Sequence, residues 1–84
     1  MNNNKLYQTE DLFLCVTLTV FGFHLESIEI NTNSQRASFV FHISDDLLKT
    51  IENYWKQQLS VEPQRLFQSY RLVRNRLQEA KRDI

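Results

Sequence analysis

The chain has 84 residues, of which 42% are hydrophobic and 24% charged, and a formal net charge of zero, which suits one small domain and leaves no room for a second. Its single cysteine excludes an internal disulfide and a cysteine-based zinc or iron–sulfur site, and its single glycine, Gly22, excludes a Gly-rich phosphate loop. Because no apolar run approaches the roughly 18 residues of a membrane span and the N-terminus lacks an apolar signal core, we expect a cytoplasmic protein with no membrane segment.

The first element, over residues 10–21, has two possible structures. Apolar residues fill both phases of a period of two and many are β-branched, as in a strand buried on both faces. The ends of the segment favour a helix instead. Thr9 can cap a helix, and Glu10 and Asp11 suit its positive N-terminus. Gly22 can adopt the left-handed conformation that closes a helix. These residues alone leave both structures open.

The next two elements form a predicted β-hairpin. Residues 23–30 and 36–42 have strand-like patterns, and five polar, turn-prone residues separate them. We expect Ile30 to pair with Arg36. One face of the hairpin then carries the apolar residues Phe23, Leu25, Ala37, Phe39 and Phe41. The other face is left open and carries the candidate interface residues Ile28, Ile30 and Val40.

Two helices complete the predicted fold. Ser44 can cap a helix that ends near Ser60, and Trp55 is expected to anchor this helix in the core. Pro63 starts the last helix, whose apolar residues have the most regular helical spacing in the chain. The predicted core consists of Leu12, Val16, Leu25, Phe39, Phe41, Leu48, Ile51, Trp55, Leu66, Tyr70, Val73 and Leu77.

These elements predict one α+β domain over residues 7–84, with the order helix, β-hairpin, helix, helix, after a flexible N-terminus over residues 1–6. A two-stranded sheet has two unpaired edges, so we expect the hairpin to bind a partner protein or a second copy of the chain. The apolar stripe of the last helix offers a second route to a homodimer, because it also fits a coiled-coil seam.

Several short motifs occur in a fixed order along the chain. They are Tyr7-Gln8-Thr9 with Asp11-Leu12, Gly22 with Leu25, Phe39-Val40-Phe41, Tyr54-Trp55, Val61-Glu62-Pro63 with Phe67, and Leu72 through Leu77. In this order, over roughly residues 7–77, the chain resembles a family of small bacterial and phage proteins known only as a domain of unknown function. The resemblance implies a helix–hairpin–helix–helix domain, and hence a helix over residues 10–21, but it transfers no catalytic residue. The turn of the hairpin departs from such proteins, because it contains no glycine.

Few side chains have the pattern of a reactive site. His24 and His42 would lie opposite each other in the predicted hairpin, with Glu26 on the same face, which allows a metal site or a pH-sensitive pair. The spacing of a known metal motif does not support a metal site, and Cys15 lies in an apolar segment typical of an inert thiol. We therefore predict no catalytic, cofactor or metal site, no enzymatic activity and no small-molecule substrate.

The charges favour binding at one end of the chain. Residues 1–62 hold four basic and eight acidic residues, a net charge of −4, whereas residues 63–84 hold six basic and two acidic residues, a net charge of +4. The candidate polyanion contacts share one flank of the last helix: Phe67, Arg71, Arg74, Lys81 and Arg82. The leading hypothesis is a small non-enzymatic binding or adaptor module that acts through protein contacts. The alternative is a nucleic-acid-binding accessory protein that uses the basic helix.

Overall fold

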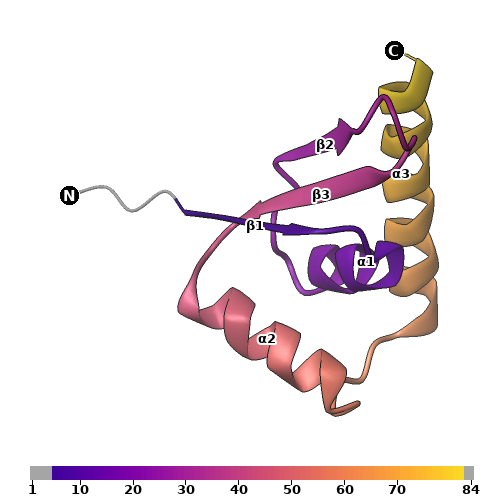
Figure 1. Cartoon of the computed structure of the whole chain (residues 1–84). Coiled ribbons are helices and arrows are strands. Elements are labelled where there is room, and N and C mark those ends of the chain that lie inside the picture. The colour runs from indigo at the N-terminus through magenta and orange to yellow at the C-terminus, as the bar shows by residue number, and fades with distance from the viewer. Residues whose placement is uncertain (1–4, 83–84) are drawn as a thin grey trace.

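The computed structural model describes residues 5–82 and places three helices beside a three-stranded antiparallel sheet (Figure 1). The elements in chain order are β1 (Leu6–Thr9), α1 (Leu12–Val20), β2 (Ser27–Ile30), β3 (Ala37–His42), α2 (Asp45–Trp55) and α3 (Pro63–Arg82). The structure confirms the predicted α+β class and the order of helix, hairpin and two helices. It adds the strand β1, which the sequence analysis did not predict.

β1 pairs with β3, so β3 is the central strand of the sheet, in the order β1-β3-β2. Leu6 lies opposite His42, and Thr9 lies opposite Phe39. Four residues are too few for an alternating pattern to stand out, and it is the pairing with β3 that defines this strand. β1 begins at Leu6, the last residue of the segment 1–6 that we expect to be flexible. Within that segment, residues 1–4 lie outside the described residues.

β2 and β3 pair one residue away from the predicted register. Ile30 lies opposite Ala37 rather than Arg36. The turn explains the shift, because the Asn31 N–H donates to the Arg36 carbonyl at 2.8 Å and so closes the loop between these two residues. Gln35 has a φ of +62°, in the left-handed region that a glycine often supplies in such turns. The hairpin therefore closes without a glycine.

This shift moves the candidate interface residues. Ile28 lies opposite Phe39 and packs against the core, and Ile30 lies on the same face as Ile28. Val40 lies on the opposite face and is only 1% exposed. The expectation that Ile28, Ile30 and Val40 share one open face is wrong, because a shift of one residue turns each side chain of a strand to the other face.

α1 confirms the helical alternative for the ambiguous segment. Asp11 caps it in place of Thr9, and its carboxylate accepts hydrogen bonds from the N–H groups of Phe13 and Leu14 at 2.9 and 3.1 Å. The Thr9 hydroxyl instead accepts a hydrogen bond from the Asp11 N–H at 3.1 Å. Gly22 follows the helix with a φ of +93°, the left-handed conformation expected of it.

The core lies between the sheet and the helices, with α1 below the strands and α3 running upright along their side in the view of Figure 1. Its buried residues are Leu14, Cys15, Val16, Leu18, Leu25, Phe39, Phe41, Leu47, Ile51 and Val73. Four further predicted core residues are partly buried against this cluster, namely Leu12, Leu66, Tyr70 and Leu77. Six of the twelve predicted core residues are thus fully buried and four partly buried.

The prediction for α2 is wrong in its helical phase. Leu47 is fully buried and Tyr54 packs partly buried against the core, whereas Leu48 is 45% exposed and Trp55 is 62% exposed. Leu47, Ile51 and Tyr54 are spaced by four and then three residues, and Leu48, Ile51 and Trp55 by three and then four, so both stripes fit a helix and both include Ile51. Trp55 is therefore a surface residue that stacks edge-on against Tyr54, with ring centroids 4.9 Å apart.

α3 begins at the predicted proline. The Glu62 carboxylate accepts hydrogen bonds from the N–H groups of Gln64 and Arg65 at 3.1 and 3.0 Å, which caps the helix at the residue before Pro63. α3 runs for 20 residues and packs along α1 and β2. Within residues 5–82, none of the helices has the length and apolar character needed to cross a membrane.

Candidate functional site

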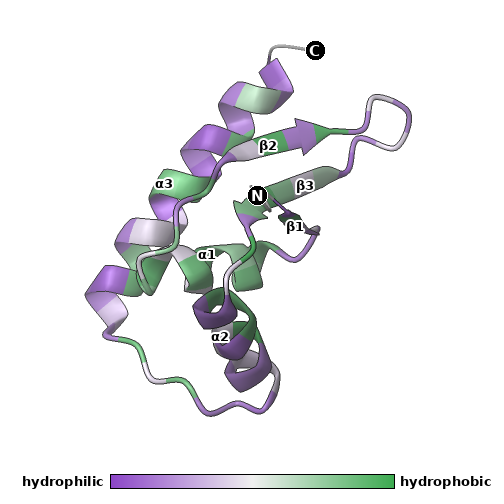
Figure 2. Cartoon of the chain, turned by 90° about the vertical axis from the view of Figure 1, so that its left-hand side faces the viewer, coloured by the Kyte–Doolittle hydropathy of each residue, from purple (hydrophilic) through white to green (hydrophobic). Residues whose placement is uncertain are grey.

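α1 has the composition of a buried helix but an exposed side. No residue from Leu12 to Val20 is charged (Figure 2). Thr17 and Thr19 donate their hydroxyl protons back to the carbonyls of Phe13 and Val16, at 2.8 and 2.7 Å, so neither hydroxyl needs a partner outside the helix. Phe13 is nevertheless 65% exposed. An apolar helix of this kind normally has both sides covered.

The exposed side of α1 forms one wall of an apolar groove of about 390 Å³, which we call the α1–α3 groove. Its lining residues are Phe13, Val16, Thr17, Leu66, Phe67 and Tyr70. Phe67, from α3, is 61% exposed and faces the same space as Phe13. Two phenylalanines from different helices thus leave most of their surface to solvent around one groove.

Positive charge lies beside this groove on α3. The Arg74 guanidinium donates to the Tyr70 hydroxyl at 2.8 Å, and its Cζ lies 5.6 Å from the centre of the Tyr70 ring. Arg71 lies one helical turn from both Phe67 and Arg74 and is exposed. Phe67, Arg71 and Arg74 therefore lie on one flank of α3. Lys81 and Arg82 lie further along the helix and are exposed.

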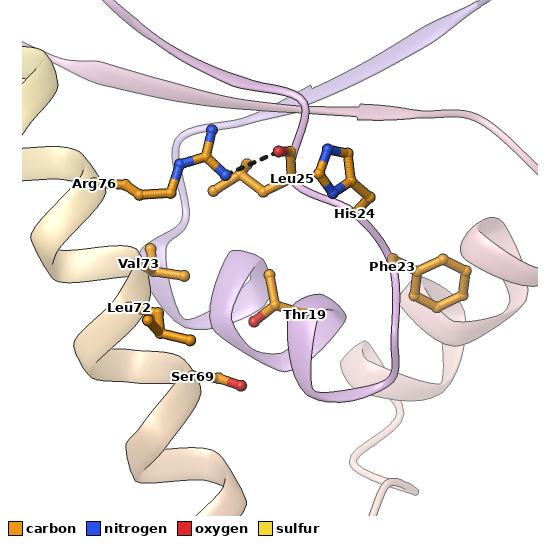
Figure 3. A pocket seen from close by; sticks show the side chains of 8 residues that line it. All are labelled: Thr19, Phe23, His24, Leu25, Ser69, Leu72, Val73 and Arg76. Carbon is orange, nitrogen blue, oxygen red and sulfur yellow. Dashed lines mark hydrogen bonds between the residues drawn. The ribbon is translucent and has the colours of Figure 1, made fainter.

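A second groove, of about 310 Å³, lies on the other flank of α3 (Figure 3). Its lining residues are Thr19, Phe23, His24, Leu25, Ser69, Leu72, Val73 and Arg76. Arg76 donates from Nη1 to the Leu25 carbonyl at 2.9 Å and so ties α3 to the segment before β2 (Figure 3). Leu72 is 66% exposed on this flank. This groove has a single exposed apolar residue from α3 and an arginine that is bound to the backbone.

The histidines are not paired as predicted. β2 begins at Ser27, so His24 lies before the strand rather than opposite His42. His42 instead lies 3.2 Å from the carboxylate of Glu26, measured between Nε2 and Oε2. Among residues 5–82, no three His, Cys, Asp or Glu side chains are arranged to hold a metal ion.

Cys15 is buried in the centre of α1 and has no exposed surface. Burial raises the pKa of its thiol from 9.0 to about 12, although the positive charge of Arg76 opposes this increase. Nucleophilic chemistry needs an accessible thiolate, so this geometry matches the inert thiol expected from the sequence.

Residues 4–79 match a protein family described as Domain of unknown function (DUF5659). The chain belongs to this family. The match covers the region over which the motifs from Tyr7 to Leu77 resemble a domain of unknown function, and it confirms that resemblance. No curated protein and no solved structure matches the chain. The function of this DUF5659 domain is therefore inferred from the arrangement of its own residues.

The sequence indicates Phe67 of this DUF5659 domain as a candidate polyanion contact, but it indicates neither the α1–α3 groove nor Phe13. Phe67 was singled out because it shares a flank with the basic residues of α3. The sequence does not indicate Phe13, because a helix that is apolar on every side has no periodic pattern that would show which side is exposed. The feature of the sequence that could have indicated this surface is that α1 contains no charged residue although the 20-residue helix α3 is basic.

Proposed function

We propose that this DUF5659 chain is a non-enzymatic binding module that holds a segment of a partner protein in the α1–α3 groove. The observation that supports this function is the exposure of Phe13 and Phe67, 65% and 61%, on two helices that face one apolar groove. Apolar side chains gathered on the surface of a small domain are typical of protein contacts, and aromatic residues supply most of the binding energy in them.

The chemistry of the groove describes the partner segment. Its lining accepts two or more apolar side chains, since Phe13, Val16 and Leu66 present hydrocarbon to it. Arg71 is exposed beside Phe67 and favours a carboxylate on the segment at the rim. An amphipathic helix with one acidic residue next to its apolar stripe meets both conditions.

A photo-crosslinking residue at position 67 tests this proposal. We expect benzoylphenylalanine at position 67 to form a discrete adduct with one host protein, which is then purified for binding measurements. Position 72 is the matched control, because Leu72 is equally exposed but lies on the opposite flank of α3. Adducts of equal yield at both positions would argue against a site in the α1–α3 groove.

Single substitutions then measure the contribution of the groove. Phe13→Asp or Phe67→Asp should weaken binding of the purified partner by about 30-fold or more, the loss expected for an aromatic anchor worth about 2 kcal/mol. Leu72→Asp should change the affinity by less than about twofold. Phe13 lies in the first turn of α1, where an aspartate is favourable for the helix, so the fold should be retained. A Phe13→Asp variant that binds as well as wild type would refute the proposal.

The charge of α3 supports a second candidate function, nucleic-acid binding. Residues 63–82 contain six basic residues and one acidic residue, and Phe67 lies beside Arg71 on one flank. Proteins that bind single strands combine exposed aromatic rings with cations in this way. Arg74 is already bound to Tyr70, so Arg71 and Lys81 are the cations better placed to contact phosphates.

Salt dependence tests this second candidate. Arg71→Ala with Lys81→Ala should weaken binding across sequences and reduce the slope of log K against log salt by about two units for duplex DNA. The control is Lys49→Ala with Lys56→Ala, which removes the same charge from α2 and its C-cap and should leave that slope unchanged. If wild type binds neither single- nor double-stranded DNA or RNA at low salt, nucleic-acid binding is excluded.

A further inference from the structure

The outer edge of β1 offers unpaired backbone groups. The Ile43 N–H donates to the Lys5 carbonyl at 2.9 Å, which makes Lys5 and Ile43 a hydrogen-bonded pair of the antiparallel ladder. Hydrogen-bonded and non-hydrogen-bonded pairs alternate in such a ladder. The N–H and C=O groups of Tyr7 and Thr9 therefore point to β3, whereas those of Leu6 and Gln8 point away from the sheet. The free edge of β1 thus presents two donors and two acceptors.

The side chains on this edge do little to prevent pairing. β1 contains no proline, and within residues 5–9 the only charged side chain is Lys5. Leu6 is 48% exposed, and Gln8 is exposed beside it. The opposite edge of the sheet differs, because β2 carries exposed Glu29 and is preceded by exposed Glu26. Two copies of β2 would bring these carboxylates together.

We infer that two copies of this chain form a homodimer by antiparallel pairing of their β1 strands, with the two-fold axis at Tyr7. This register places Leu6 of each copy opposite Gln8 of the other, which forms four hydrogen bonds between the copies and a continuous sheet of six strands. Pairing Leu6 with Leu6, or Gln8 with Gln8, uses only half of these backbone groups within residues 5–9. The symmetric register about Tyr7 is therefore favoured.

Charge also fits this register. Lys5 of one copy lies opposite Thr9 of the other and next to Glu10, so a cation from each copy approaches a carboxylate from its partner. Glu10 is 53% exposed at its side chain and already pairs with Arg36 at 3.1 Å, which leaves a carboxylate oxygen accessible. The dimer is independent of the α1–α3 groove. It replaces the predicted dimer through the hairpin, because β1 occupies the edge of β3 on which that prediction partly relied.

Sedimentation equilibrium at micromolar concentration tests the dimer. We expect a species of about 20 kDa, twice the mass of the 10.1 kDa chain. Gln8→Pro should halve this mass, because it removes an outward N–H that pairs with the second copy and leaves every β1–β3 hydrogen bond in place. Gln8→Ala is the matched control and should remain a dimer. A 10 kDa wild type, or a dimer that persists in Gln8→Pro with an unchanged circular dichroism spectrum, would overturn the inference.

Cysteine crosslinking tests the register and does not depend on the proline. We expect a mixture of Leu6→Cys and Gln8→Cys chains to form disulfide-linked dimers several-fold faster than either variant alone, since these positions face each other only between copies. The native Cys15 is buried and does not compete. Equal rates in the mixture and in the separate variants would rule out this pairing. Leu6→Lys provides a further dissociating variant that should yield a monomer if Gln8→Pro does not fold.

Discussion

Replacing Phe39 with alanine is expected to lower the free energy of unfolding by about 3–5 kcal/mol, a large part of the stability of so small a domain. Phe39 lies at the centre of β3, between Thr9 of β1 and Ile28 of β2, and is 2% exposed. Removing its ring leaves a cavity that both neighbouring strands and α1 would have to fill. Urea unfolding followed by circular dichroism measures this change.

Trp55→Ala is the matched comparison and should change the free energy of unfolding by less than about 1 kcal/mol. Trp55 is 62% exposed, and the contact with Tyr54 is its one aromatic contact among the described residues. The helical spacing of Leu48, Ile51 and Trp55 predicts the opposite result, because it places Trp55 in the core. A Trp55→Ala variant as unstable as Phe39→Ala would show that α2 packs in the predicted phase and not in the observed one.

The error in α2 has a definite physical origin. Leu47 precedes Leu48 and Tyr54 precedes Trp55, so two stripes one residue apart are equally periodic. The stripe that a helix buries depends on how well each fits the surface that it meets, here α1, and that surface cannot be read from α2 itself. In the observed stripe Leu47 is fully buried in place of Leu48, and Tyr54 packs partly buried in place of the larger Trp55.

The sheet shows a similar limit. The core residues Phe39 and Phe41 follow from alternation along β3, and the structure confirms that both are buried. β2 begins at Ser27, four residues later than predicted. The register depends on how the turn closes between Asn31 and Arg36. One hydrogen bond between these two residues and the left-handed conformation of Gln35 determine it. β1 depends on pairing with β3, between residues that are 30 to 36 positions apart in sequence. Patterns of neighbouring residues do not contain these long-range pairings.

The candidate site was predictable only where charge marked it. Arg71 and Arg74 indicate one flank of α3 as a binding surface, and Phe67 is predicted to belong to that surface because it lies on the same flank. Phe13 is part of the site because α1 packs against α3 in a way that leaves the first turn of α1 exposed. A surface formed by two helices depends on how they pack. The residues that the uniformly apolar helix α1 contributes to it could therefore not be predicted from the sequence.

The buried thiol of Cys15 should make the fold sensitive to alkaline pH. Its pKa is raised by burial to about 12 in the folded protein, against 9.0 when the chain is unfolded. The folded state therefore holds this proton more tightly than the unfolded state. The stabilising effect of the protonated thiol is complete below pH 9 and is lost as the pH rises toward 12. Over this range the free energy of unfolding falls by up to about 1.4 kcal/mol for each pH unit.

Comparing wild type with Cys15→Ala isolates this effect. Between pH 8 and pH 10.5, wild type should lose about 1–2 kcal/mol more of its free energy of unfolding than the variant, because alanine has no proton to lose. Burial, aided by the charge of Asp11, also raises the pKa of Tyr54, and this contribution acts in the same direction in both proteins and cancels. Urea unfolding at the two pH values measures the difference. Equal losses would mean that water reaches Cys15 in the folded state, and the close packing of α1 against β3 and α3 would then be wrong at its centre.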